Sequence, residues 1–127
     1  GFTYLLHQKP NVDAMNEAAE TLLNYQDFQC FSRTNTDVKT YHCNVEKAYW
    51  RVENDQLIFT IAANRFLRNM VRAIVGTLLD VGNAKISLEE FHAVIASKNR
   101  VNAGSSAPAN GLYLTKVLYP EEIFVAD

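Results

Sequence analysis

The sequence predicts an α+β domain in which helices pack on one face of a mainly antiparallel β-sheet. Three observations carry this prediction: two strand-like runs joined by a short polar turn, two helical stretches after them, and a final alternating run that predicts a returning strand. The chain of 127 residues fits one domain, residues 1–127, which is long enough to bury a core without disulfides or a metal.

The first helix is expected to begin after Asn11, a favourable N-cap, and to stop near Asn24. Residues 25–39 show no sustained period and predict a loop that is partly packed by Phe28 and Phe31. The apolar stripe of the helix recurs at helical spacing (Met15, Ala18, Ala19, Leu22 and Leu23).

The two strand-like runs cover residues 40–52 and 56–62, and residues 53–55 form the polar turn between them. Their β-branched and aromatic content and the short turn predict a hairpin. A last strand is predicted over residues 111–119, where successive side chains alternate between two faces.

A long helix is predicted over residues 64–81, with Gly82 as the glycine that follows its C-terminus. A further helix is expected to start at Ser87, because Ser87 and Glu90 have the spacing of a capping box. The small residues at 102–110 predict a loop between this helix and the last strand.

The composition sets limits on the function. Apolar residues make up 48% and charged residues 20% of the chain, and the formal net charge is −2, so any basic surface must be local. Two cysteines are too few for a disulfide framework and, with no signal segment or long apolar run, predict a cytoplasmic protein that does not enter a membrane. Gly1 in place of an initiator Met suggests a boundary within a longer protein, although processing gives the same start.

Three arginines, Arg65, Arg68 and Arg72, are spaced by three and then four residues, which places them on one face of the predicted long helix. Cations in the first turns oppose the helix macrodipole at a cost of about 0.3–1 kcal/mol per charge, and like charges at these spacings repel. Helix stability therefore does not explain the stripe. An anionic partner, either phosphate or carboxylate, would explain it, because the arginine fork suits both groups. The solvated face of an amphipathic helix is the alternative interpretation.

The stretch RFLRNMVRAIVGTLLDVG at residues 65–82 closely resembles a helix of the bacterial tRNA pseudouridine synthase A (TruA) family. Three further segments agree in order: DFQCFSR at 27–33, ASKNR at 96–100 and SAPANGLYLTKVLYP at 106–120. Four ordered matches that span most of the chain are much more specific than any single motif.

The resemblance implies an isomerase that converts uridine to pseudouridine in the tRNA anticodon stem-loop without a metal or organic cofactor. In that family an aspartate attacks the nucleoside, and the uracil detaches, turns and rejoins its ribose through carbon. By position, Arg72 corresponds to the arginine that pairs with this aspartate, since a guanidinium favours the ionised carboxylate and fixes its direction. Leu112 corresponds to a leucine that packs against the target base, where an apolar wall stabilises a flipped nucleotide.

The nucleophilic aspartate of the family is not in this chain. The family carries it in a GRTDxGVHA-type motif in the N-terminal half, and no such stretch occurs here. The run RTNTD at residues 33–37 lacks the glycines and histidine of that motif, so Asp37 is not assigned as the nucleophile. We therefore expect the chain to be the C-terminal half of the catalytic domain, to supply one wall of the active cleft and to be inert alone.

Three arginines are assigned as contacts of tRNA phosphates: Arg65, Arg68 and Arg100, with Lys98 adding charge beside Arg100. For Arg65 and Arg68, solvent exposure or internal pairing is an equal alternative. No metal site is expected, because the histidines and cysteines lack ligand spacing (Cys30, His42 and Cys43 among them). The hairpin aromatics favour packing over base stacking (Tyr41, Tyr49 and Trp50).

The expected partner is tRNA. The resemblance implies a homodimer for the intact enzyme, and a chain that lacks half of its sheet is expected to self-associate through an exposed strand edge and an apolar helix face. The competing hypothesis is a non-catalytic RNA-binding or protein-interaction module. An upstream GRTDxGVHA-like segment supports the enzyme, and a true start at Gly1 supports the module.

Overall fold

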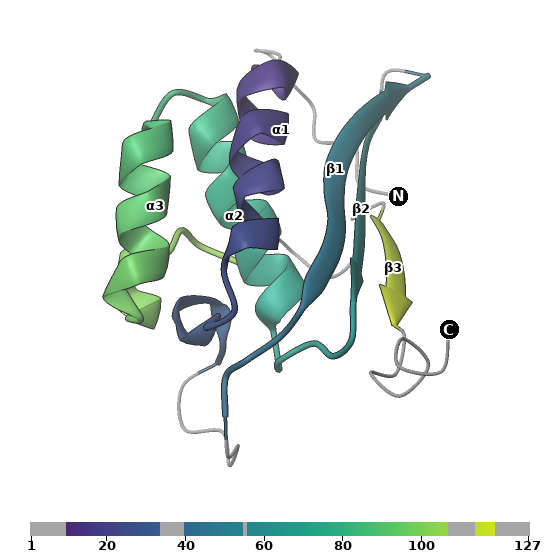
Figure 1. The fold of residues 1–127 in the computed structure, drawn as a ribbon. Helices are drawn as coiled ribbons and strands as arrows, with labels where there is room; N and C mark the ends of the chain where they lie inside the picture. Colours follow the sequence, from purple (N-terminus) through teal and green to yellow (C-terminus); the bar gives the residue numbers. More distant parts are fainter. Residues whose placement is uncertain (1–9, 34–39, 55, 107–113, 119–127) are drawn as a thin grey trace.

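The computed structural model describes residues 10–33, 40–54, 56–106 and 114–118 (Figure 1). Three α-helices, three short 3-10 helices and three strands follow one another along these residues: α1 (Val12–Thr21), η1 (Leu22–Asn24), η2 (Gln29–Phe31), β1 (Val45–Glu53), β2 (Gln56–Ala63), α2 (Met70–Gly82), α3 (Leu88–Ser97), η3 (Arg100–Asn102) and β3 (Leu114–Leu118). None of the helices in the described ranges is long and apolar enough to cross a membrane.

The sheet has the strand order β1-β2-β3. The predicted hairpin is confirmed: β1 and β2 pair antiparallel from Val45 opposite Ala63 to Glu53 opposite Gln56, and Asn54 in the turn has a positive φ of 51°. The shorter β3 pairs with β2 in parallel, which requires the long crossover connection that α2 and α3 provide. The predicted final strand is therefore present over residues 114–118, and its other residues lie outside the described ranges.

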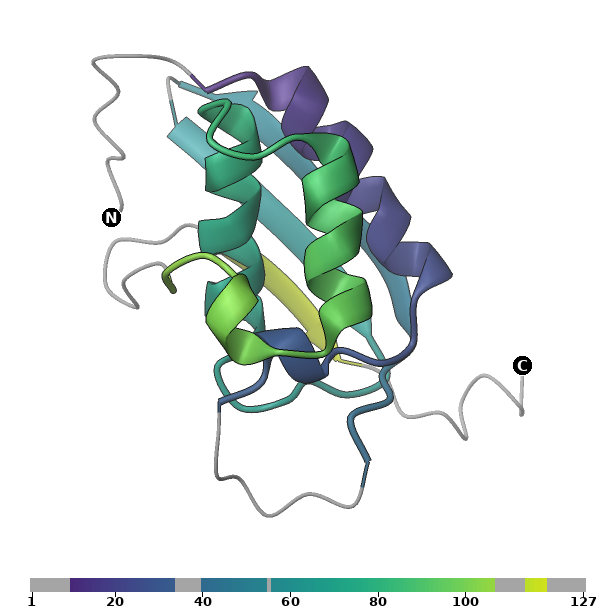
Figure 2. The ribbon, with the colours of Figure 1, turned by 90° about the vertical axis from the view of Figure 1, so that its left-hand side faces the viewer.

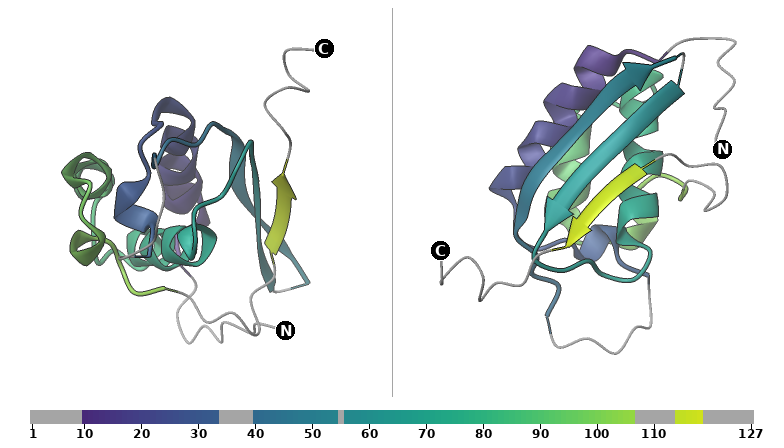
Figure 3. Two further views of the ribbon diagram at one scale, coloured as in Figure 1. Left: turned by 90° about the horizontal axis from the view of Figure 1, so that it is seen from below. Right: turned by 90° about the vertical axis from the view of Figure 1, so that its right-hand side faces the viewer.

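All three α-helices lie on one face of the sheet (Figure 1). Figure 2 shows α3 in front of α1 and α2, and the right-hand view of Figure 3 shows the opposite face of the sheet with no described helix across it. The left-hand view of Figure 3 separates the layers, with α3 outermost, α1 and α2 in the middle and the strands on the far side. The predicted fold class is confirmed.

The core contains the aromatic residues of the segment that follows α1. Phe28 and Phe31 are fully buried, as expected, and their ring centroids lie 6.4 Å apart, while Phe31 lies 6.3 Å from Phe91 of α3. On the sheet side, Trp50 packs on Phe59 at 4.8 Å. The predicted loop at residues 25–39 therefore includes the 3-10 helix η2, which anchors α3 to the rest of the core.

Side-chain caps fix the helix starts that the sequence predicts. The Asn11 carboxamide oxygen accepts the N–H of Ala14 (3.0 Å), and α1 ends at Thr21 with η1 continuing to Asn24. At α3, the Glu90 N–H donates to Ser87 Oγ (3.1 Å) and the Ser87 N–H donates to Glu90 Oε1 (2.9 Å), so the predicted capping box is confirmed.

The exposed edge of the sheet at β1 is partly covered by α1. The Asn16 side chain accepts the backbone N–H of Trp50 (2.6 Å) and donates to its carbonyl oxygen (3.1 Å). These bonds hold α1 against the edge strand and occupy backbone groups that another strand would need for pairing. Self-association through this part of β1 is therefore obstructed.

The predicted long helix begins later than expected. Because α2 starts at Met70, only Arg72 of the three arginines is helical, and the prediction that Arg65, Arg68 and Arg72 share one helix face is wrong. Asn69, immediately before α2, has φ 66° and ψ 5°, a left-handed conformation that asparagine tolerates better than most residues. The chain thus turns sharply where the apolar pattern alone suggested a continuous helix.

Tertiary contacts hold the segment before α2 in its extended path. The Asn64 N–H donates to the Asn44 carbonyl oxygen (3.1 Å), and the Asn44 N–H donates to Asn64 Oδ1 (2.8 Å), which ties the end of β2 to the start of β1. Further along, the Arg68 carbonyl oxygen accepts the N–H of Arg33 (3.0 Å). These backbone groups bond to distant parts of the chain, so they are not available for helical bonds.

Gly82 has a different role from the one expected. It is the last residue of α2, and the left-handed residue after the helix is Ala84 (φ 61°), so the prediction of a glycine beyond the helix end is wrong. Gly82 is needed for close packing, because a Cβ there would lie 2.7 Å from Met15 Cγ and 2.9 Å from Pro10 Cβ. Its carbonyl oxygen also accepts the N–H of Asn11 (2.8 Å), which joins the end of α2 to the start of α1.

We predict that Gly82→Val lowers the free energy of unfolding by about 1–3 kcal/mol, because the added methyl groups overlap the Met15 and Pro10 side chains. Urea denaturation of the chain measures this change. Glu20→Val, on the exposed side of α1, serves as the control and is expected to change the stability by about 0.5 kcal/mol or less. Equal stability of the two variants would contradict the packing role.

Candidate active-site wall at the start of helix α2

Arg72 lies in the first turn of a helix that is otherwise buried almost all round. Its chain neighbours Val71 and Ala73 are buried, whereas Arg72 itself is half-buried. A cation at this position opposes the helix macrodipole, which favours anions near an N-terminus. An anionic group beside the first turn would remove this conflict, and a carboxylate matches the planar fork of the guanidinium.

The segment after α3 is docked along α2 by hydrogen bonds. The Gly104 N–H donates to Thr77 Oγ1 (2.9 Å), and the Thr77 hydroxyl donates to the Ala73 carbonyl oxygen one turn earlier (2.8 Å). A Cβ on Gly104 would lie 3.2 Å from the Thr77 Cα and would also meet the Asp80 carboxylate, so the backbone approaches α2 closely. The chain is thereby guided along α2 toward the end that carries Arg72.

Ser106 connects this segment to the residue that precedes α2. Its Oγ accepts hydrogen bonds from Asn69 Nδ2 (2.7 Å) and from Arg100 Nη2 (2.9 Å), and Arg100 Nη1 donates to the Gly104 carbonyl oxygen (3.2 Å). Both lone pairs of the serine oxygen are thus used, and its proton remains as a donor. Ser106 and Asn69 are residues that sequence reasoning missed as organisers, although both lie in stretches that carry the family resemblance.

The arginines of the predicted stripe have three different surroundings. The Arg65 guanidinium donates through Nη1 to the carbonyl oxygens of Thr40 (2.9 Å) and His42 (3.2 Å), so it supports the chain that leads into β1. Arg68 is exposed and Arg72 is half-buried in α2. The structure therefore separates Arg65 from Arg72. Leu112, predicted to pack on a base, lies outside the described residues, between Ser106 and β3.

Both cysteines are buried free thiols. Burial raises the pKa of Cys30 from 9.0 to about 12 and that of Cys43 to about 11, with Arg100 and Arg65 respectively opposing the shift. The Cys43 thiol lies 3.8 Å from the Met70 sulfur at the start of α2. Among the described residues, no group of three or more histidine, cysteine or carboxylate side chains is placed to hold a metal ion.

The hairpin aromatics divide between packing and exposure. Trp50 is buried on Phe59, as the packing interpretation expects, and Tyr41 packs half-buried against the core. Tyr49 is 43% exposed on the sheet face away from the helices. Tyr49 is therefore the most exposed ring of this group.

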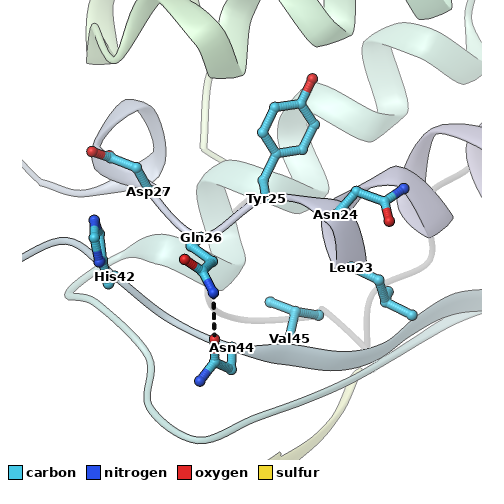
Figure 4. A pocket seen from close by; sticks show the side chains of 8 residues that line it. All are labelled: Leu23, Asn24, Tyr25, Gln26, Asp27, His42, Asn44 and Val45. Carbon is cyan, nitrogen blue, oxygen red and sulfur yellow. Dashed lines mark hydrogen bonds between the residues drawn. The ribbon is translucent and has the colours of Figure 1, made fainter.

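A hollow of about 540 Å³ lies between the segment after α1 and the chain leading into β1 (Figure 4). Its side chains do not converge on one point: Tyr25 extends toward α3, where its hydroxyl lies 2.7 Å from His92 Nδ1, and Gln26 bonds to Asn44 across the opening. It therefore shows no arrangement for catalysis. The lining residues are Leu23, Asn24, Tyr25, Gln26, Asp27, His42, Asn44 and Val45.

Comparison with known proteins shows one consistent match. The family model described as tRNA pseudouridine synthase matches residues 18–120. The tRNA pseudouridine synthase A of Bacteroides fragilis is 52% identical over 124 residues, covering 97% of this chain and 49% of the relative. The protein of the same name from Parabacteroides distasonis is 50% identical over 124 residues, covering 98% and 49%.

A more distant relative agrees with these matches. The tRNA pseudouridine synthase A of Treponema denticola is 38% identical over 125 residues, covering 98% of this chain and 47% of the relative. The chain therefore spans about half the length of the curated relatives it matches. The similarity extends well beyond the short segments at residues 27–33, 65–82, 96–100 and 106–120.

We predict that the free energy of unfolding falls as the pH rises above 9. The thiols ionise near pH 9 in the unfolded chain but stay protonated in the folded chain up to about pH 11 at Cys43 and about pH 12 at Cys30, so alkaline pH favours the unfolded state. Urea denaturation from pH 8 to alkaline pH measures the effect. The Cys30→Ala/Cys43→Ala variant is expected to lose less stability than the wild type over this range. If the stability of both proteins falls equally with pH, the two thiols are not its cause.

Proposed function

The chain belongs to the tRNA pseudouridine synthase family, and we propose that the protein that carries it converts uridine to pseudouridine in the tRNA anticodon stem-loop. The names and similarity of the relatives support this activity. Because the chain covers about half of each relative, the proposal concerns the whole enzyme, of which residues 1–127 would form the C-terminal half of the catalytic domain.

In this proposal the chain supplies one wall of the active cleft, and Arg72 is its central residue. The single observation that carries the proposal is the half-buried Arg72 guanidinium in the first turn of a buried helix, where it opposes the macrodipole. A family aspartate from outside this chain would pair with it. The guanidinium would keep that carboxylate ionised and aim one oxygen at the nucleoside.

The reaction proposed is an isomerisation, so it requires no oxidant, reductant or organic cofactor. The bond between uracil and ribose breaks and a carbon–carbon bond replaces it, with the same atoms in substrate and product. Leu112 would form the apolar wall against the flipped base. This assignment is supported by the position of Leu112 in the sequence.

The same proposal extends to the tRNA contacts, the oligomeric state and the location of the enzyme. Arg68 and Arg100 would contact tRNA phosphates. Arg65 would contact the tRNA backbone only through the N–H groups that do not donate to the Thr40 and His42 carbonyl oxygens. The intact enzyme would be a homodimer in the cytoplasm. The Asn16 bonds to Trp50 favour self-association through surfaces other than the centre of β1.

We predict that Arg72→Ala in the full-length protein lowers the rate of pseudouridine formation at saturating tRNA by about 100-fold or more, as for other lost electrostatic contacts at a reacting centre. The affinity for tRNA is expected to change by only a few-fold, because Arg72 would act on a carboxylate. Single-turnover kinetics and direct tRNA binding measure the two effects.

The matched control is Arg51→Ala, which removes the same charge from an exposed arginine of β1 that pairs with Glu53 (3.2 Å). Its rate of pseudouridine formation should equal that of the wild type. An equal loss of rate and affinity in Arg72→Ala would indicate a phosphate contact. A full-length protein that binds tRNA without modifying it would favour the RNA-binding module.

A further inference from the structure

A second hollow, of about 460 Å³, lies where the segment containing η2 meets the C-terminal end of α3. Figure 2 shows η2 and η3 side by side below α3. The hollow is separate from the one in Figure 4 and has no residue in common with it. Its lining residues are Gln29, Ser32, Arg33, Tyr41, Ser97, Lys98, Asn99 and Arg100.

Three cations and no carboxylate of the described residues line this hollow, although the whole chain has more acidic than basic residues. The cations are Arg33, Lys98 and Arg100. The nearby carboxylate of Asp27 lies 3.6 Å from Lys98 Nζ, and its other oxygen accepts the N–H of Gln29 (3.0 Å). Among the described residues, one acidic group therefore lies beside the three basic groups of this hollow.

The cations come from separate parts of the fold. Arg33 follows η2, and its backbone N–H is held by the Arg68 carbonyl oxygen (3.0 Å), while Lys98 is the left-handed residue that ends α3 (φ 56°). Arg100 begins η3. Like charges gathered from distant segments repel one another, and an anion bound between them would offset this repulsion.

Arg100 is oriented before any ligand arrives. Its Nη1 and Nη2 groups donate to the Gly104 carbonyl oxygen (3.2 Å) and to Ser106 Oγ (2.9 Å), which uses two of the five N–H donors of the guanidinium. At the same rim, Asn99 Oδ1 accepts the N–H of Val101 (3.0 Å), so the Asn99 amide has its N–H donors left for the hollow. A fixed set of donors suits the several oxygens of a phosphate.

We propose that this hollow binds one phosphate of the tRNA backbone, held by Arg33, Lys98 and Arg100. The assignment rests on the proposed function and extends it to the position of the substrate. Ser106 accepts from both Arg100 and Asn69, and Asn69 directly precedes the helix that carries Arg72. The phosphate is therefore bonded to the network that sets the start of α2, and its binding fixes the register of the RNA strand relative to Arg72.

The test uses the full-length protein with the double substitution Arg33→Gln/Lys98→Gln. Both residues are exposed, so the fold is retained, and Arg100 is left intact because it also holds Ser106. The dissociation constant for unmodified tRNA is measured over a range of salt concentrations. The slope of its logarithm against the logarithm of the salt concentration is expected to decrease in magnitude by up to about 0.7–0.9, the value for one phosphate contact, because only Arg100 still holds the phosphate.

The matched control is Lys47→Gln/Lys85→Gln, which removes two exposed charges, one on β1 and one in the turn before α3. The control should keep the wild-type slope. The control should also keep the wild-type rate of pseudouridine formation at saturating tRNA, because Lys47 and Lys85 lie in neither the hollow nor the hydrogen-bond network that precedes α2. A slope in the Arg33→Gln/Lys98→Gln variant equal to that of the control would overturn the phosphate site.

Inorganic phosphate distinguishes the RNA backbone from a free anion. If inorganic phosphate competes with tRNA for the wild-type protein but not for the Arg33→Gln/Lys98→Gln variant, and the variant also has the reduced slope, the proposal is supported. If the competition is lost in the variant but its tRNA slope is unchanged, the hollow binds only the free anion and the proposal is overturned. A wild-type protein that forms no pseudouridine would reject the proposed function, whereas an active enzyme with an unchanged slope rejects the phosphate site alone.

Discussion

Helix α2 lies in the layer between the sheet and α3, and nearly all of its surface is buried. At its C-terminal end the Gly82 carbonyl oxygen holds α1, and in its middle Thr77 receives the Gly104 N–H. At its start the left-handed Asn69 holds Ser106. Burial removes the rotational freedom of the helix, so the direction of Arg72 is set by contacts far from it. The candidate active-site wall depends on this packing.

The hydrogen bonds around α2 divide the arginines by their roles. Arg65 stabilises the chain leading into β1, and Arg100 both holds Ser106 and faces the basic hollow. Arg72 is the member of the predicted stripe that occupies the helix itself. A cation at that position destabilises the helix slightly, and such local conflicts are typical of functional sites. The proposed carboxylate would add a favourable contact to Arg72, and the proposed phosphate would add one to the cations of the hollow.

The sequence predicts those elements that depend on local chemistry. The hairpin, the Asn11 cap and the Ser87–Glu90 capping box follow from side chains close together in the chain, and the structure confirms them. The start of α2 could not be predicted in this way, because residues 64–69 are held by Asn44 and Arg33, which are remote in sequence. Arg33 and Lys98 are likewise far apart in the sequence, so no local pattern indicates that they line the same hollow. The local pattern predicts Gly82 as a helix terminator, whereas the structure requires a glycine there because of the close contact with Met15, which is remote in sequence.

We propose that this chain contributes Arg72 and lacks the carboxylate that reacts. Pseudouridine formation on unmodified tRNA tests it most directly, first with the folded 127-residue chain alone and then after addition of a separate polypeptide that carries the family's aspartate motif. We expect no turnover by the chain alone and turnover by the mixture, which Arg72→Ala abolishes. Turnover by the chain alone would contradict this proposal, because the nucleophile would then have to lie within these residues.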